Sequence, residues 1–416
     1  MPARTGHHGR VMTAHRRVGS RAPLVGLAAA VLALLLLPSL VLGAQWTSLE
    51  RVSPTGGSRL DSLHQLAAAK GELHLVHPRL GPGKTDDKVV YQRSRDRGRT
   101  WTREKVLFSA TDKRRRVVPN LALDARDRIV VAAYRVAGPS GHALLVRVSR
   151  DGGRTFGKRI ELFETKNEKG IGVPAVAIGN DVIALAWTNR ASGKIKISTS
   201  RDDGRRFNGA RTLATTKLSI DCKERVTDGL VGLAINDRSI HLAWSHASSR
   251  QCYASAIRAR TSLDRGRTWS AVRTISERDS FGWPELDSRG KTVLATVQAT
   301  DGSLILARSE KNGRNWRDRK LKPPRGYIYS AADVQLLPRK KAVIAFVRER
   351  LKKDRLVATQ LITRRSADDG ASFGKAKPVT REARLLRLAP NLAANQSRVS
   401  LVVQSGELDG SPRHIY

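Results

Sequence analysis

The chain has 416 residues, of which 76 are Lys or Arg and 37 are Asp or Glu, so its formal net charge at pH 7 is +39. This charge favours anionic surroundings, such as wall polymers, acidic glycans, lipid headgroups or nucleic acid. The basic residues are spread over the whole chain, which favours a generally basic surface and argues against a dedicated nucleic-acid-binding arm.

The N-terminus has the order of a secretory signal. Residues 1–21 carry five Arg and no acidic residue, residues 24–42 are almost wholly apolar, and Gly43 and Ala44 follow. We predict that residues 1–44 form a signal peptide, or an uncleaved signal anchor, because an apolar run of this length could also cross a membrane. Both alternatives place residues 45–416 outside the cytoplasm, as a secreted or tethered domain that touches a membrane only through an uncleaved N-terminus. Nucleic acid is then expected to bind only non-specifically.

An eight-residue phrase, Ser-x-Asp-x-Gly-x-x-Trp/Phe, recurs after this segment. Five copies begin at Ser94, Ser149, Ser200, Ser262 and Ser366. In a degenerate copy beginning at Ser309, Lys311 replaces the aspartate. The steps between the Asp positions are 55, 51, 62, 47 and 57 residues. A repeat of this size predicts an array of identical supersecondary units.

Each part of the phrase has a structural role. The Asp is expected to accept backbone N–H groups and form a turn, and the Gly supplies a positive φ. The aromatic ring would pack beneath the turn. The predicted turn-forming residues are Asp96, Trp101, Asp151, Phe156, Asp202, Phe207, Asp264, Trp269, Asp368 and Phe373.

Each unit contains four short apolar strands, with the phrase between the third and the fourth. In the second unit we expect strands at 120–123, 129–134, 143–148 and 158–162. Four antiparallel strands repeated radially predict an all-β propeller.

The number of blades follows from the two ends of the chain. Six full units run to about residue 380. A half-unit at 391–394, 399–404 and 414–416 adds three strands, and residues 45–52 resemble the strand that follows each phrase. Pairing this N-terminal strand with the C-terminal half-blade predicts seven blades and leaves no open sheet edge, with six blades as the alternative.

The phrase resembles the Asp-box, or BNR repeat, of sialidases and related propellers, and the resemblance covers nearly everything after residue 45. It implies that ligands bind on the face opposite the boxes, at the mouth of the central channel. Sialidase catalytic domains have six blades, so the blade count bears on function.

Three features map to that face. Cys222 and Cys252 fall in neighbouring loops and are predicted to form a disulfide, because the chain is exported. The first strands bring Gln65, Asn120, Glu285, Asp333 and Asn391 to the channel mouth, as a binding ring or as solvated lining. Loop residues Trp283, Arg325, Tyr327 and Tyr329 place aromatic and charged groups at the same rim, which suits sugar rings. No pattern of metal-ligand spacing occurs, so we predict neither a metal nor a cofactor.

The resemblance also implies what a sialidase would need: three Arg, an Asp acid/base, and a Tyr nucleophile beside a Glu. The usual Phe/Tyr-Arg-Ile-Pro phrase is missing from residues 59–65. The remaining candidates for such chemistry are Arg225, Asp228, Glu285, Arg325, Tyr327 and Tyr329.

Three functions remain open, because fold alone does not determine function. The first is an exported, non-catalytic and monomeric propeller that binds a glycan or an anionic envelope polymer at the channel mouth. The second is an exo-α-sialidase or related glycosidase, and the third is a structural or assembly propeller for a membrane complex. We favour the binding protein over the enzyme because the arginine phrase is missing.

Overall fold

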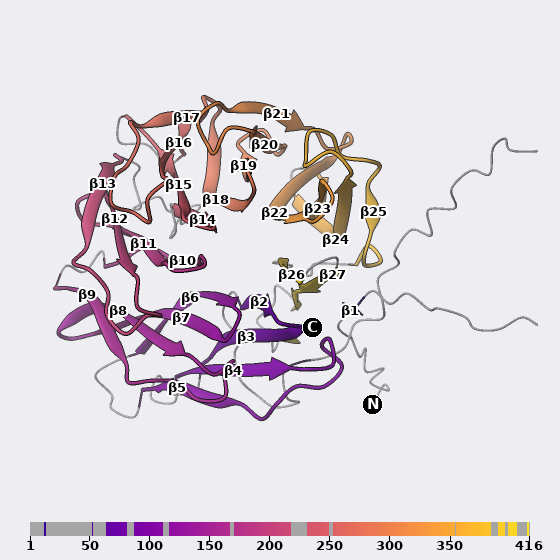
Figure 1. Ribbon diagram of the computed structural model, residues 1–416. Coiled ribbons are helices and arrows are strands. Elements are labelled where there is room, and N and C mark those ends of the chain that lie inside the picture. The colour runs from indigo at the N-terminus through magenta and orange to yellow at the C-terminus, as the bar shows by residue number, and fades with distance from the viewer. Residues whose placement is uncertain are drawn as a thin grey trace, which may run out of the picture.

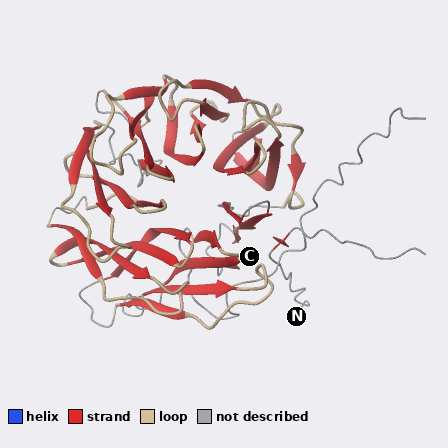
Figure 2. Ribbon diagram, in the orientation of Figure 1, coloured by secondary structure: helices blue, strands red, loops and turns tan. Residues whose placement is uncertain are grey.

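The described part of the chain is a ring of antiparallel sheets. The computed structural model describes residues 12–13, 52, 64–80, 87–110, 116–166, 170–217, 231–248, 253–353, 355–383, 390–395, 398–405 and 414–415. These residues form strands and loops without any helix (Figure 2). Among them there is therefore no helix that could cross a membrane. The predicted signal segment, residues 1–44, lies outside the described residues except for Met12 and Thr13.

Six four-stranded blades follow one another around a central axis (Figure 1). Blade one holds β2 (Gln65–Ala69), β3 (Glu72–Arg79), β4 (Lys88–Ser94) and β5 (Lys105–Ser109). Blade two holds β6 (Arg116–Arg126), β7 (Ile129–Gly138), β8 (Gly141–Ser149) and β9 (Ile160–Thr165). Blade three holds β10 (Ala175–Ile178), β11 (Ile183–Asn189), β12 (Lys194–Ser200) and β13 (Arg211–Thr215). Blade four holds β14 (Val231–Asn236), β15 (Ser239–His246), β16 (Ala256–Ser262) and β17 (Arg273–Ser276). Blade five holds β18 (Ser280–Arg289), β19 (Thr292–Ala299), β20 (Leu304–Ser309) and β21 (Arg317–Leu321). Blade six holds β22 (Tyr327–Leu337), β23 (Lys341–Lys352), β24 (Arg355–Ser366) and β25 (Lys377–Pro378).

The preference for seven blades was wrong, because the last unit does not complete a four-stranded sheet. Its strands β26 (Asn391–Asn395) and β27 (Arg398–Val402) pair with each other, and β1 (Met12–Thr13) adds two residues to β27. The expected third strand, β29 (His414–Ile415), pairs instead with β28 (Gln404–Ser405). The described residues therefore hold six complete blades.

Closure by an N-terminal strand at residues 45–52 is not confirmed. Of that segment only Val52 is described, and it is buried in a cluster with Leu66 of blade one and Leu392 of β26. The place between blades six and one is occupied by β26, which lies between β22 and β2 (Figure 1).

Apolar side chains fill the spaces between blades. Trp187 of blade three packs in the cluster that blade two shares with it, and Trp244 of blade four packs in the next cluster along the ring. Both rings are almost fully buried. Burial of aromatic rings of this size contributes a large share of the packing free energy. The blades are thus held mainly by sheet-on-sheet contacts, and the innermost strands approach one another closely.

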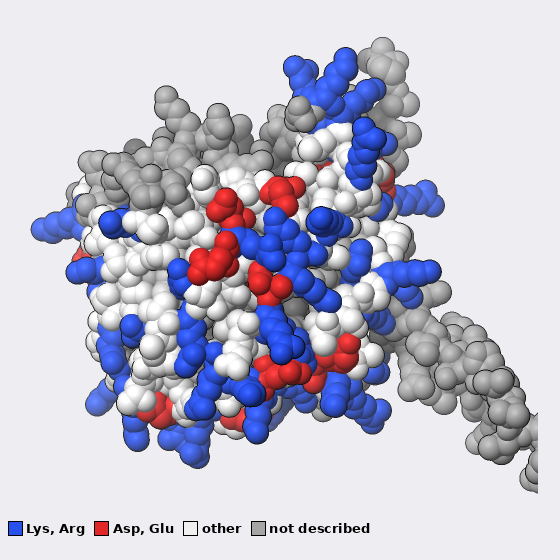
Figure 3. All heavy atoms as spheres, turned by 90° about the horizontal axis from the view of Figure 1, so that it is seen from above, with Lys and Arg blue, Asp and Glu red and all other residues white. Residues whose placement is uncertain are grey.

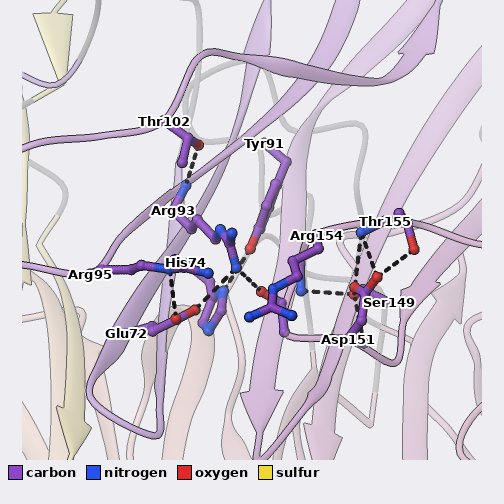
Figure 4. Close-up of polar contacts among 12 residues, drawn as sticks. Glu72, His74, Tyr91, Arg93, Arg95, Thr102, Ser149, Asp151, Arg154 and Thr155 are labelled. Atoms are coloured by element: carbon purple, nitrogen blue, oxygen red, sulfur yellow. Dashed lines mark hydrogen bonds and ion pairs between the residues drawn. The ribbon is translucent and has the colours of Figure 1, made fainter.

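The recurring phrase forms a turn in the structure (Figure 4). In the second copy, Asp151 Oδ1 accepts hydrogen bonds from Ser149 Oγ at 2.7 Å and from Thr155 N at 2.9 Å. Its Oδ2 accepts one from Thr155 Oγ1 at 2.6 Å. The turn has two successive positive φ angles, at Gly152 and Gly153, which explains the glycine of the phrase.

We expect Asp151→Ala to lower the free energy of unfolding by about 1–2 kcal/mol, because three hydrogen bonds to one exposed carboxylate are lost. Urea denaturation of the purified protein measures this change. Asp279→Ala removes an exposed carboxylate outside a turn phrase and should change stability by less than about 0.5 kcal/mol. Equal effects of the two substitutions would contradict a stapling role for Asp151.

Arginine side chains link the turn phrases of blades two, three, four and six to the preceding blade. Arg93 Nη1 donates to the carbonyl of Gly152 at 3.0 Å (Figure 4). The same contact recurs around the ring, from Arg150 to Asp203 at 2.9 Å, from Arg201 to Arg265 at 3.2 Å and from Arg308 to Asp369 at 2.9 Å. Part of the large arginine content is therefore structural.

Candidate functional site

A cavity of about 550 Å³ runs along the axis of the ring and is lined by the innermost strand of every blade. Its polar side chains lie in two tiers. The upper tier comes from residues four positions before the end of their strands, namely Gln65, Glu285, Asp333 and Asn391. The lower tier comes from residues two positions before the end, namely Asp124, Asp287 and Gln335.

The carboxyl groups of the channel hold neighbouring blades together. Asp124 Oδ2 accepts a hydrogen bond from Ile178 N of the next blade at 2.7 Å. Asp287 Oδ2 accepts one from Leu336 N at 2.6 Å. The other oxygen of each carboxyl accepts the N–H of the residue that follows it in its own strand. Each aspartate thus connects two innermost strands.

The upper tier repeats this connection across the incomplete seventh unit. Asp333 Oδ2 accepts from Leu392 N at 2.6 Å, and the side-chain oxygen of Asn391 accepts from Leu66 N. The amide oxygen of Asn391 therefore links two neighbouring innermost strands, as the carboxyl groups of Asp124, Asp287 and Asp333 do.

Burial shifts the ionisation of these acids. Burial raises the pKa of Asp124 to about 7 and the pKa of Asp287 to about 6, although backbone hydrogen bonds from the next blade oppose the shift. The pKa of Asp333 is also raised, first by burial and then by the negative charge of Glu285. The upper tier thus holds two acids, of which Asp333 is held toward its neutral form, in a chain that is strongly basic overall.

Cationic groups line the channel only near the hairpin turns at its other end, among the residues that the structure describes. Lys70, Arg126 and Arg289 lie there, and Asp127 lies beside them. On the side of the ring that Figure 3 shows, basic side chains are widespread and acidic ones form a smaller group near the middle. The carboxyl groups of the upper channel contrast with the basic character of this side.

Four of the predicted binding residues meet in the channel. Gln65, Glu285, Asp333 and Asn391 line it. Asn120 and Trp283 lie in β6 and β18, but their side chains are outside the described residues. Arg325 is exposed and does not line the channel cavity.

The two tyrosines of the blade-six loop belong to β22. Tyr329 is only 2% exposed, and its ring lies 4.6 Å from that of Phe346. Tyr327 is half-buried, with the Arg348 guanidinium 4.9 Å from its ring centre. Neither ring lines the channel that contains Glu285, so neither forms the predicted contact with that carboxylate there.

Several other predicted groups lie outside the described residues. They are Cys222, Arg225, Asp228 and Cys252. The predicted disulfide therefore stays a prediction. Within the described ranges, no group of three or more His, Cys, Asp or Glu side chains is arranged to hold a metal ion.

The sequence interpretation missed Asp124 and Asp287, although a signal was present. Both follow a leucine and lie two residues before an arginine at the strand end, in Leu-Asp-Ala-Arg and Leu-Asp-Ser-Arg. An aspartate near a hairpin is usually a turn former. Here its position on the innermost strand directs it to the next blade.

The comparisons with known proteins agree with this architecture. Residues 30–224 match the family model described as a BNR repeat-like domain. The chain is a β-propeller that contains a BNR repeat-like domain. The BNR-repeat propeller is similar in fold to the phage phi92 endosialidase, with a TM-score of 0.52 and 10% identity over 91% of this chain and 70% of that one.

Other solved structures are less similar to the BNR-repeat propeller. The NanB sialidase from Streptococcus pneumoniae has a TM-score of 0.48 and 12% identity, over 72% of this chain and 68% of that one. An α-L-arabinanase from Penicillium chrysogenum has a TM-score of 0.46 and 11% identity, over 73% of this chain and 95% of that one. A comparison with curated proteins gives no match.

Proposed function

We propose that this BNR-repeat propeller is an exported binding protein that holds a glycan at the upper end of its central channel. The observation that carries the proposal is the channel itself. It is about 550 Å³ in volume and lined by polar side chains from separate blades. Small-molecule sites have volumes of this order, with a few convergent polar groups.

The engagement of the channel acids argues for binding over catalysis. Asp124, Asp287 and Asp333 each accept backbone hydrogen bonds from two strands, which fixes their position. A glycosidase needs a carboxyl group or a tyrosine that is free to act on the scissile bond. Among the described residues, Tyr329 is buried and Tyr327 is stacked against Arg348, so the described part offers no such tyrosine to the channel.

The charge of the upper tier favours one class of glycan. The negative charge of Glu285 would repel the carboxylate of an acidic sugar, whereas carboxyl and amide oxygens accept hydrogen bonds from hydroxyl and ammonium groups. The channel ligand is therefore a neutral or amino-bearing saccharide. Solved structures with a similar fold include enzymes named as sialidases and an arabinanase, which supports a saccharide ligand in general.

Titration calorimetry of the purified protein tests this assignment. We expect binding of chitobiose or its de-acetylated dimer. Gln65→Ala and Glu285→Gln should weaken binding about tenfold, because each removes one polar contact of about 1.4 kcal/mol. Arg289→Gln, at the other end of the channel, is the matched control and should leave the affinity unchanged.

Two outcomes would overturn the proposal. One is equal weakening by the control and the upper-tier variants, which would move binding away from the upper tier. The other is hydrolysis of a fluorogenic sialoside by the parent protein that is lost in Tyr327→Phe, which would establish the sialidase alternative.

A further inference from the structure

A second site arises in blade five, where the turn phrase has lost its aspartate. In the intact phrase of blade four, Asp264 accepts hydrogen bonds from Ser262 Oγ at 2.7 Å and from Thr268 N at 2.9 Å. The corresponding donors in blade five are Ser309 and Asn315, with Lys311 at the aspartate position. Lys311 has no acceptor atom in its side chain, so the place of the carboxylate is taken by a cation.

A cavity of about 520 Å³ lies against this altered turn, between blades five and six. The turn contributes Lys311, Asn315 and Trp316 to its lining, and β21 contributes Arg317 and Arg319. Phe373, from the turn phrase of blade six, lies across from them, with the Arg319 guanidinium 6.0 Å from its ring centre. Cationic and aromatic groups thus share one crevice.

The acidic residues nearby are already engaged. Asp318 Oδ2 accepts hydrogen bonds from Ser276 Oγ and Arg278 Nε, both at 2.7 Å, on the side of blade four. Glu310 pairs with Arg308 at 2.5 Å. Lys311 and Arg317 are exposed and form no ion pair with any residue that the structure describes. The crevice therefore carries an excess of positive charge.

We propose that the crevice between blades five and six binds an acidic saccharide, a sugar that bears a carboxylate or a sulfate. The anionic group lies where the other turn phrases have their own carboxylate, close to Lys311 and Arg317. The sugar ring packs against the aromatic rings of Trp316 and Phe373, as apolar sugar faces do. A volume of about 520 Å³ suits a ligand of one or two sugar units, since small-molecule sites span about 300–1,000 Å³.

This site is separate from the channel and is independent of the proposed channel function. The channel ligand is neutral or amino-bearing, and the crevice ligand is anionic. The two sites also lie mostly on different parts of the blades, because the crevice is built mainly on β20, β21 and the turn phrases, and Val334 is the one described residue that lines both cavities. A channel variant such as Gln65→Ala is therefore expected to leave crevice binding unchanged.

Titration calorimetry of the full chain tests the crevice. The probes are digalacturonic acid, N-acetylglucosamine 6-sulfate and neutral cellobiose, at about 0.15 M salt, where charges more than about 8 Å apart are screened. We expect binding of at least one acidic probe, unchanged in Gln65→Ala, and we expect Gln65→Ala to weaken any binding of neutral cellobiose, which would occupy the channel. The comparison of the two acidic probes tells whether the site prefers a carboxylate or a sulfate.

Lys311→Asp is the decisive variant, because it restores the turn phrase and supplies the missing carboxylate from the chain itself. We expect it to weaken acidic-sugar binding by at least about tenfold, the effect of one charged contact. Its melting temperature should rise by about 1–2 °C, since the turn regains its hydrogen bonds. Loss of binding in a protein of equal or greater stability cannot come from misfolding.

Lys158→Asp is the matched control, with the same change of charge at an exposed lysine just after the turn phrase of blade two. It should bind the acidic probes as the parent does. Equal weakening by Lys158→Asp and Lys311→Asp would mean that net charge alone attracts the sugar, and would overturn the proposal. Binding of cellobiose to Gln65→Ala as tight as that of the acidic probes, or no binding of either acidic probe, would also overturn it.

Discussion

Replacing Gly232 by alanine is expected to lower the free energy of unfolding by about 3 kcal/mol, because blades four and five meet at this glycine. A β-carbon there would lie 1.9 Å from the carbonyl oxygen of Pro284 and 2.6 Å from Leu286 Cδ1. Neither a backbone carbonyl nor its strand can move away without opening the contact between the two blades. Urea denaturation at pH 7, read by tryptophan fluorescence, measures the loss.

The matched control for this substitution is Gly209→Ala. A β-carbon at Gly209 would have no atom within 4 Å. That substitution should leave stability unchanged or raise it by about 0.5 kcal/mol, since alanine restricts the unfolded chain. Similar stability of the Gly232 variant and the parent would show that the inner strands of these blades are not in tight contact.

Asp124→Asn is expected to stabilise the protein at high pH and not at low pH. Burial raises the pKa of Asp124 from 3.8 to about 7 in the folded state. A raised carboxyl pKa contributes stability that is complete below about pH 3.8 and is lost as the pH rises through 7. Asparagine keeps one acceptor for Ile178 N and carries no charge, as Asn391 does naturally toward Leu66.

The stability gained from Asp124→Asn should therefore increase by about 3 kcal/mol between pH 4 and pH 8. The groups that face Asp124 include Asp287, whose charge raises its pKa further, and Arg126, which lowers it. Urea midpoints at each pH unit from 4 to 8 measure the change. Asp127→Asn is the control, because the side chain of Asp127 is 69% exposed and touches only Lys70 at 3.7 Å. A gain for Asp124→Asn that is the same at every pH would contradict a raised pKa.

The repeat phrase was sufficient to predict the propeller and its four-stranded blades. The phrase starting at Ser149 lies between β8 and β9, between the third and fourth strands as expected. The strand limits were less accurate. The first strand of blade two was expected at 120–123 but runs from Arg116 to Arg126, because a bulge between Val118 and Ala122 lets the strand continue past the break in alternation.

A β-bulge also explains why the two tyrosines of blade six were predicted to lie in a loop. Residues 325–329 were predicted to form a loop. Pro324 directly precedes this stretch, and Gly326 lies within it. The strand begins at Tyr327, however, and a bulge between Ser330 and Asp333 separates its two paired parts. Tyr329 therefore packs in the core and not at the rim. Bulges depend on the partner strand, so a single-strand pattern does not reveal them.

The candidate site was predicted in part. Residues that open the first strands were expected near the axis, and Gln65, Glu285, Asp333 and Asn391 do lie there. The contacts of Asp124 and Asp287 with the next blade were not foreseen, since they join residues about 50 positions apart in the sequence. Such contacts follow from the radial arrangement and not from any local pattern.

The arginine contacts between turn phrases have a consequence for the evolution of the ring. Blades one, two, three and five each donate from an arginine to the turn phrase of the next blade, as from Arg93 to Gly152 and from Arg150 to Asp203. A head-to-tail contact of this kind can form between any two copies of the unit. A blade could therefore be duplicated or deleted while the neighbouring blades keep the same type of interface. The contact is the same whatever the number of blades in the ring, so it does not determine that number. Blade number is then set by the angle between neighbours, and the six copies of the phrase match the six complete blades, whereas the half-unit at the C-terminus does not add a seventh.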